Sequence, residues 1–211
     1  MANTMSKADL VASLKSSLHD AASVFVGEGA DLDTAFERFL LQALPDMQAK
    51  RPATRLGSVT IEANFPRVAV GSTDGFAAFK TSLWGDGCSI KPWEPTYPGA
   101  LPRVAATFAE QQWWLNFDPA PSSKQISAHG SQFDFWYYAE HAIGTLAADT
   151  TINQQDRGLL ILRAQVEAMR ELSIRNAAKP VALRDGLSGQ PRNSTPAALA
   201  DSLMRTFTET R

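Results

Sequence analysis

The feature that most constrains the fold of this chain is a change of hydrophobic period along its length. Apolar residues recur at the three- and four-residue spacing of amphipathic helices from Ser6 to about Arg51, and again from Asn153 to the end. The block between is aromatic, is interrupted by Pro and Gly, and alternates with the two-residue period of strands. The pattern predicts an α+β protein, with a helical bundle formed by N- and C-terminal helices and an inserted antiparallel β domain.

The same change of period places the domain boundaries. Residues 1–56 and 151–180 are predicted to form the helical bundle, and residues 57–150 the inserted β domain. Residues 181–211 are predicted to form a connector followed by a last helix, because residues 181–194 are rich in Gly, Pro and polar side chains. At 211 residues the chain is long enough to bury a sizeable core in one composite domain or two small ones.

Capping residues indicate where the helices begin. Ser6, with an acidic residue three positions later, and Asn153, with the same spacing, are predicted N-caps, and Thr195 before a proline is a third. In the second helix, Pro45 either kinks the helix or restarts it. The bundle core is predicted to contain Leu14, Phe39, Leu162 and Val166. The solvent-exposed face of the long C-terminal helix is predicted to carry Arg163, Glu167, Arg170 and Glu171.

The middle block predicts several short strands separated by turns. The alternation of Val59, Ile61, Ala63 and Phe65 with polar residues predicts a half-buried strand from Ser58 onward. Further strands are predicted at Arg67–Val70, Cys88–Ile90, Arg103–Phe108, Trp113–Phe117 and Gln132–Ala139. A small antiparallel sheet or sandwich is the expected result.

Composition argues against several classes of protein. A balance of 20 Lys+Arg against 22 Asp+Glu is not the charge pattern of a nucleic-acid-binding protein. Cys88 is the only cysteine, so no intrachain disulfide is possible and no Cys/His group has zinc-site spacing. The first 25 residues lack the apolar stretch of a signal peptide, and the run Leu159–Leu162 is too short to span a bilayer. We expect a soluble protein made in the cytoplasm, without metal, cofactor or membrane partner.

No motif has the spacing that catalysis requires. His19, His129 and His141 lie far apart in the sequence, and a metal ligand set or a catalytic triad needs positioned partners. The sequence around Ser188 differs from a nucleophile elbow, because its second glycine comes one residue early and no strand precedes it. We therefore predict no catalytic residues and no enzymatic activity.

Aromatic residues are concentrated in the predicted strands 113–117 and 132–139. Neighbouring strand residues point to opposite faces, so one of each pair packs inside while the other must be covered by something else. Trp113, Trp114, Trp136 and Tyr138 are accordingly predicted to lie in the core or at a subunit interface. A sugar- or base-stacking platform is the less favoured interpretation.

Several segments together resemble head-to-tail adaptor (connector) proteins of tailed bacteriophages. They are, in order, LDTAFERFLLQALPDMQAKRP, SVTIEANFPRVAV, FAAFKTSLWG, LPRVAATF, WWLNFDPAP, FDFWYYAEHAI and TINQQDRGLLILRAQVEAMREL. The resemblance covers most of the chain and depends on the order and spacing of these segments. It implies a virion structural protein of the viral neck, with no catalytic residues, that forms a homo-oligomeric ring, commonly a dodecamer. Pro45 departs from the regular second helix that is usual in this family.

The resemblance also implies partners. The ring would dock on the portal protein, bind tail or neck proteins on its other side, and let DNA pass without specific binding. The matching portal-binding segment would be residues 181–211, which the sequence makes mildly basic. The residues expected to bind the portal are Arg184, Arg192, Leu199, Leu203, Arg205 and Phe207.

Two other functions remain open from the sequence. A β-sandwich carbohydrate- or receptor-binding module would require Trp113, Trp114 and Trp136 to be exposed together on one face. A small hydrolase would require Ser188, a carboxylate and either His129 or His141 to converge.

Overall fold

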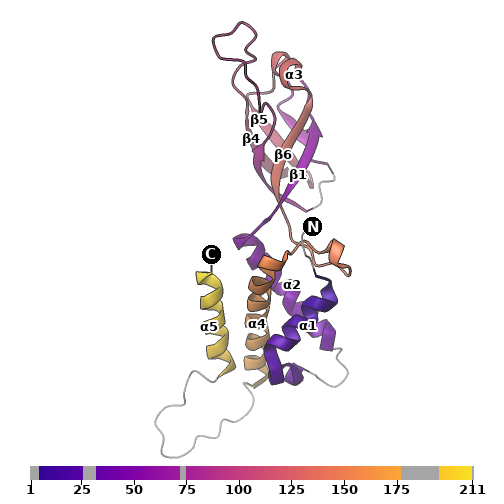
Figure 1. Ribbon diagram of the computed structural model, residues 1–211, viewed down its shortest axis with the longest axis vertical. Helices are drawn as coiled ribbons and strands as arrows, with labels where there is room; N and C mark the ends of the chain where they lie inside the picture. The colour runs from indigo at the N-terminus through magenta and orange to yellow at the C-terminus, as the bar shows by residue number, and fades with distance from the viewer. Residues whose placement is uncertain (1–4, 26–31, 72–74, 177–194, 211) are drawn as a thin grey trace, which may run out of the picture. The chain divides into compact units, whose positions relative to one another are not determined.

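The chain forms two compact units, one helical and one built of strands. The computed structural model describes residues 5–25, 32–71, 75–176 and 195–210. The helical unit comprises Met1–Pro52 and His141–Arg211, and the β unit comprises Ala53–Glu140 (Figure 1). The predicted fold class, α+β with helices from both ends of the chain and an antiparallel β insertion, is confirmed.

The β unit begins and ends earlier than the boundaries at 57 and 150 that the sequence suggested. Its first strand, β1 (Ala53–Thr60), starts directly after Pro52. The first residues of this strand do not alternate clearly between apolar and polar side chains, so the hydrophobic pattern does not predict a strand there. Residues 141–153 contact the helical unit instead of the sheet, because backbone and side-chain hydrogen bonds hold them there.

The helical unit contains four α-helices among the described residues. Helix α2 continues through Pro45, so the helix does not restart there. The four α-helices and two short 3₁₀ helices of this unit are α1 (Lys7–Leu18), η1 (His19–Phe25), α2 (Leu32–Lys50), η2 (Ala147–Asp149), α4 (Gln154–Asn176) and α5 (Pro196–Glu209).

The predicted helix caps form. The Ser6 side chain accepts from the backbone N–H of Asp9, whose carboxylate accepts from the backbone N–H of Ser6, so the two make a reciprocal capping box. The Asn153 side chain accepts from the backbone N–H of Asp156 at 2.8 Å. The Thr195 hydroxyl accepts from the N–H of Ala198 at 3.2 Å. The sequence therefore located three helix starts correctly.

Helix α4 is the centre of the helical unit, because α1, α2 and α5 all pack against it. Phe25, Phe36 and Phe39 form a cluster of edge-to-face rings with centroids 5.4–5.9 Å apart. Of the predicted core residues, Leu14, Phe39 and Val166 are buried, whereas Leu162 is only half-buried.

The β unit consists of two antiparallel three-stranded sheets, with strand orders β1-β6-β3 and β2-β5-β4. Strand β3 was not predicted, and the predicted strand Cys88–Ile90 is absent. The elements are β1 (Ala53–Thr60), β2 (Arg67–Ala69), β3 (Phe76–Ser82), β4 (Arg103–Ala109), β5 (Gln112–Asp118), α3 (Ser123–His129) and β6 (Gln132–Ala139).

The core of the β unit lies between its two sheets. Every second residue of β6 is buried, and Phe133 of this strand meets Phe117 of the other sheet with ring centroids 5.1 Å apart. Gly57 lies opposite Phe135 in β6, and a Cβ there would approach the Phe135 ring to 2.9 Å. Glycine is therefore required at position 57 by the close approach of an aromatic ring.

Candidate functional site

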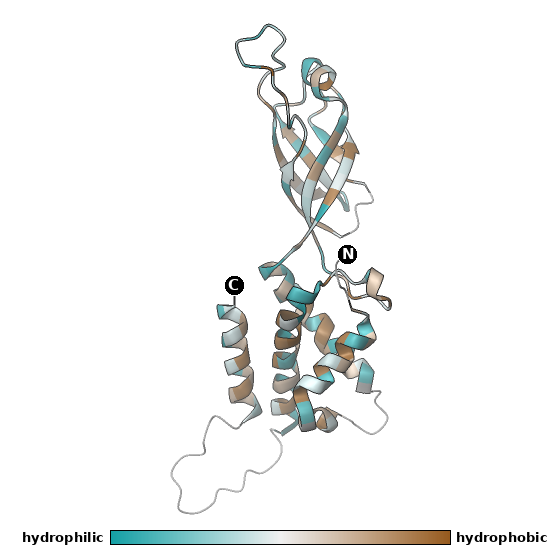
Figure 2. Cartoon of the chain, in the orientation of Figure 1, coloured by the Kyte–Doolittle hydropathy of each residue, from teal (hydrophilic) through white to brown (hydrophobic). Residues whose placement is uncertain are grey.

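The C-terminal helix α5 and the surface on which it lies form the most informative site in the helical unit. Helix α5 packs against α4, and its apolar residues face that helix (Figure 2). Ala200 and Phe207 are each only 3% exposed, and Leu203 and Met204 are partly buried beside them. We call the surface of α2 and α4 that these residues contact the α5 seat.

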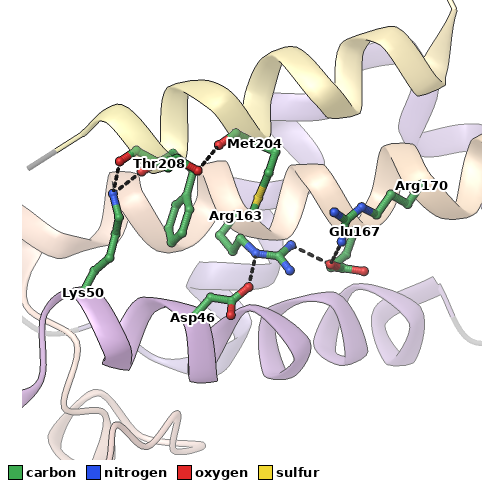
Figure 3. A network of polar contacts seen from close by, with 8 residues as sticks. Asp46, Lys50, Arg163, Glu167, Arg170, Met204 and Thr208 are labelled. Atoms are coloured by element: carbon green, nitrogen blue, oxygen red, sulfur yellow. Dashed lines mark hydrogen bonds and ion pairs between the residues drawn. The ribbon is translucent and has the colours of Figure 1, made fainter.

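Lys50, the last residue of α2, binds the C-terminal end of α5 (Figure 3). Its Nζ donates to the backbone carbonyl of Thr208 at 2.9 Å, and also to the carbonyls of Phe207 and Thr210. The same Nζ lies 4.8 Å from the centroid of the Phe207 ring. The last carbonyls of a helix have no partner within the helix and carry partial negative charge, so an ammonium group there both satisfies and stabilises them.

Arg163 of α4 lies beside the α5 seat in a network of ion pairs (Figure 3). Its Nε donates to Asp46 Oδ2 at 2.6 Å, and its Nη1 lies 2.6 Å from Glu167 Oε1. Glu167 also pairs with Arg170 at 3.0 Å. The prediction that Arg163 belongs to a solvent-exposed face is wrong: Arg163 is 5% exposed, since neighbouring helices cover this side of α4.

The charge of Arg163 is retained despite its burial. Burial by itself lowers the pKa of the guanidinium, but the hydrogen bond to Asp46, the close contact with Glu167 and the negative charges of both carboxylates outweigh this and raise the pKa above its ordinary value. Nη1 has no hydrogen bond of good geometry, so its contact with Glu167 is mainly ionic. The network therefore depends on both carboxylates.

The residues predicted to bind the portal divide into three groups. Arg184 and Arg192 lie outside the described residues. Leu199 is 44% exposed and Arg205 is exposed, so both are accessible on α5. Leu203 is half-buried and Phe207 is buried, because the helical unit itself covers them.

Helix α5 therefore packs on the helical unit and is not separate from it, whereas residues 181–194 of the predicted arm lie outside the described residues. Its apolar stripe is narrow, and such a stripe does not indicate that α4 covers it. Lys50 and Arg163, which hold this region together, were not predicted as site residues. Only their pairing partners, which lie far away in sequence, distinguish them from ordinary surface charges.

The aromatic residues of the β unit do not gather on one surface. Trp113 packs against Phe76 at 5.2 Å between ring centroids, while Trp114 points to the other face of β5, where the guanidinium of Arg67 lies 4.5 Å above its ring. Trp136 and Tyr138 lie in the other sheet, on β6, and Trp136 is 36% exposed. Trp113 thus belongs to the core, and Trp136 remains available for an interface.

A polar recess of about 430 Å³ in the β unit is lined by the loop that follows β3, the end of α3 and the start of β6, and its lining includes Cys88, His129 and Asp134. The His129 ring packs edge-on against Trp84, with centroids 5.3 Å apart. Within the part of the chain that the structure describes, no three His, Cys, Asp or Glu side chains are grouped to hold a metal ion.

His141 has a structural role at the point where the chain re-enters the helical unit. Its Nε2 lies 2.7 Å from the carbonyl oxygen of Arg51, and its Nδ1 lies 3.0 Å from the Thr151 hydroxyl. With both ring nitrogens engaged, His141 fastens the segment after β6 to the end of α2. Ser188, its proposed partner in a hydrolase, lies outside the described residues.

A scan against protein-family models and a search of curated proteins find no match to this chain. Over the described segments, no helix combines the length and the apolarity needed to cross a bilayer.

Proposed function

We propose that this chain is a virion structural protein, a head-to-tail adaptor that forms a ring, docks on the portal and links it to the tail while DNA passes through. The proposal follows the sequence resemblance described above. The structural observation that supports it best is the architecture: helices from both ends of the chain form one unit, and the β unit is inserted between them.

Exposed apolar side chains support the assembly of several copies. Large apolar residues on the helical unit, such as Leu41, Leu146 and Ile174, are 53%, 65% and 74% exposed. On the β unit, Trp93 and Phe108 are 80% and 62% exposed. Exposed apolar side chains mark surfaces that become covered in an assembly when they lie next to one another in a patch. A ring of identical subunits would cover them through repeated contacts between neighbours.

The exposed part of α5 is the proposed portal-docking surface. Leu199 and Arg205 are accessible there, whereas Phe207 serves to hold α5 on its own unit. Arginine pairs well with carboxylates at interfaces, so an acidic surface of the portal is the expected counterpart. Arg184 and Arg192, which the sequence also predicts to bind the portal, lie outside the described residues.

Charge reversal tests this docking. Full-length protein with Arg184, Arg192 and Arg205 changed to Glu should lose co-sedimentation with portal-bearing heads that lack tails. Lys124→Glu provides a control, because Lys124 is an exposed cation on α3 of the β unit. If the triple variant sediments with heads as well as the control does, the docking surface lies elsewhere. Electron microscopy of the native particle would then locate the chain.

The two competing functions lack supporting observations. A sugar-binding platform needs Trp113, Trp114 and Trp136 on one face, yet Trp113 and Trp114 point to opposite faces and Trp136 belongs to another sheet. A hydrolase needs a histidine positioned by a carboxylate, yet both ring nitrogens of His141 contact neutral groups. We therefore keep the adaptor as the single proposal.

A further inference from the structure

We propose that the α5 seat of one copy binds helix α5 of a second copy, so that neighbouring subunits are linked by exchange of their last helix. The inference concerns contacts between copies of this chain. Its test uses the purified protein alone, so its outcome is independent of portal binding.

The first argument is the form of the contact between α5 and its seat. The helix buries one apolar edge, made by Ala200, Leu203, Met204 and Phe207. Its far end is held by Lys50, whose ammonium binds the carbonyls of Phe207 and Thr208 in the last turn and that of Thr210 just after it. Among the described residues, these contacts come from one short continuous segment, residues 196–210. A neighbour's α5 would make the same contacts.

The second argument is the length of chain between α4 and α5. Helix α4 ends at Asn176 and α5 begins at Pro196, so about twenty residues join two helices that pack directly on each other. Connections between neighbouring helices in bundles usually have about two to eight residues. A chain of this length, fully extended, reaches about 60 Å. The connection is therefore long enough to place α5 on an adjacent subunit.

The third argument is energetic. The entropic cost of closing a loop rises only slowly with loop length. A long connector therefore permits α5 to dock on the seat of its own chain, but does not strongly favour this over docking on another copy. Linking two binding partners in one chain by a short linker typically gives an effective concentration of about millimolar. Subunits held side by side in an assembly present their seats at comparable concentrations, and each exchanged helix then adds a link between copies. Exchange in one direction closes into a ring when the rotation between subunits allows it.

Crosslinking distinguishes docking within a chain from docking between chains. We would place Lys50→Cys and Thr208→Cys in a Cys88→Ser background, which removes the only natural cysteine. A short bismaleimide then couples α2 to the α5 that occupies its seat. Exchange predicts a ladder of two, three and more covalently linked subunits, whereas each single-cysteine variant gives dimers at most.

Internally crosslinked monomers as the sole product would overturn the proposal, and so would a failure to couple at all, since the seat would then be empty.

A second measurement retains Lys50, in case its loss weakens docking. Chains carrying a benzophenone on Thr208→Cys, again in the Cys88→Ser background, are mixed in dilute solution with ¹⁵N-labelled chains and concentrated together. Photocrosslinks should join unlabelled α5 peptides to ¹⁵N-labelled peptides of α2 or α4. Crosslinks that join only unlabelled peptides to each other would contradict exchange.

Discussion

Phe207 makes both an apolar and a cation–π contact in the helical unit. Its ring is buried among apolar side chains of the helical unit, and the Lys50 ammonium lies over its face. A cation over an aromatic ring adds to the stabilisation from burial. Phe207 thereby couples the apolar edge of α5 to the polar contacts at its end.

Phe207→Ala should lower the free energy of unfolding of the helical unit by about 3–5 kcal/mol, since it removes a buried aromatic ring and leaves a cavity. Leu199→Ala on the same helix is the matched control and should change it by less than about 1 kcal/mol, because Leu199 is 44% exposed. Denaturant unfolding followed by circular dichroism measures both. Equal effects of the two substitutions would show that α5 is not seated as described.

The Arg163 network permits a second test at the residue scale. Asp46→Asn should destabilise the protein by about 1–3 kcal/mol, because the buried guanidinium loses one of its two carboxylate partners. Replacing both partners, Asp46→Asn with Arg163→Met, should recover much of that loss, since no buried charge remains unpaired. A double-mutant cycle from denaturant unfolding measures the coupling. Additive effects would mean that the ion pair contributes nothing.

At the scale of elements, α4 determines whether the N-terminal helices can fold. The apolar faces of α1 and α2 pack on α4, which follows the β unit in the sequence. Periodicity showed that each of these helices has an apolar stripe, but a stripe does not specify its partner. The long separation in sequence explains why the pairings had to come from the tertiary structure.

The isolated segment 1–56 should therefore show little stable helix, because its apolar residues would have no α4 to cover them. Circular dichroism of the segment alone, and again after addition of a peptide with the sequence of α4, provides the measurement. Helical signal should rise on mixing. A cooperative thermal transition of the segment by itself would contradict the prediction.

At the scale of the whole molecule, the insertion joins the helical unit through chain ends that lie close together. Ala53 at the start of β1 pairs with Ala139 at the end of β6, so the β unit is entered and left at neighbouring positions. Its core is formed within the unit, between the two sheets. An inserted domain with adjacent ends and its own core does not depend on the rest of the chain to fold.

Residues 53–140 expressed alone should consequently fold into the same pair of sheets. A dispersed two-dimensional amide NMR spectrum and a cooperative unfolding transition are the expected results. Phe133→Ala should abolish the transition or shift it strongly, because Phe133 is 1% exposed between the sheets. A collapsed spectrum of the wild-type segment would show that the β unit needs the helical unit.

The proposed ring should bind DNA weakly and in a salt-sensitive manner, since a channel wall must let DNA slide. The balance of 20 basic and 22 acidic residues fits this expectation. A mobility-shift assay at physiological salt should show no sequence preference. Tight specific binding there would contradict the adaptor proposal.

The sequence by itself determined the helix starts at Ser6, Asn153 and Thr195, because a capping side chain acts on a backbone group only three residues away. It likewise determined the strand Gln132–Ala139, whose alternation is local. The tertiary structure alone decided that Arg163 is buried and that Lys50 holds the end of α5. It also decided which chain segment covers Phe207. The contacts of Lys50 and Arg163 depend on partners more than a hundred residues away along the chain. Hydrophobic period does not indicate which helix packs against which.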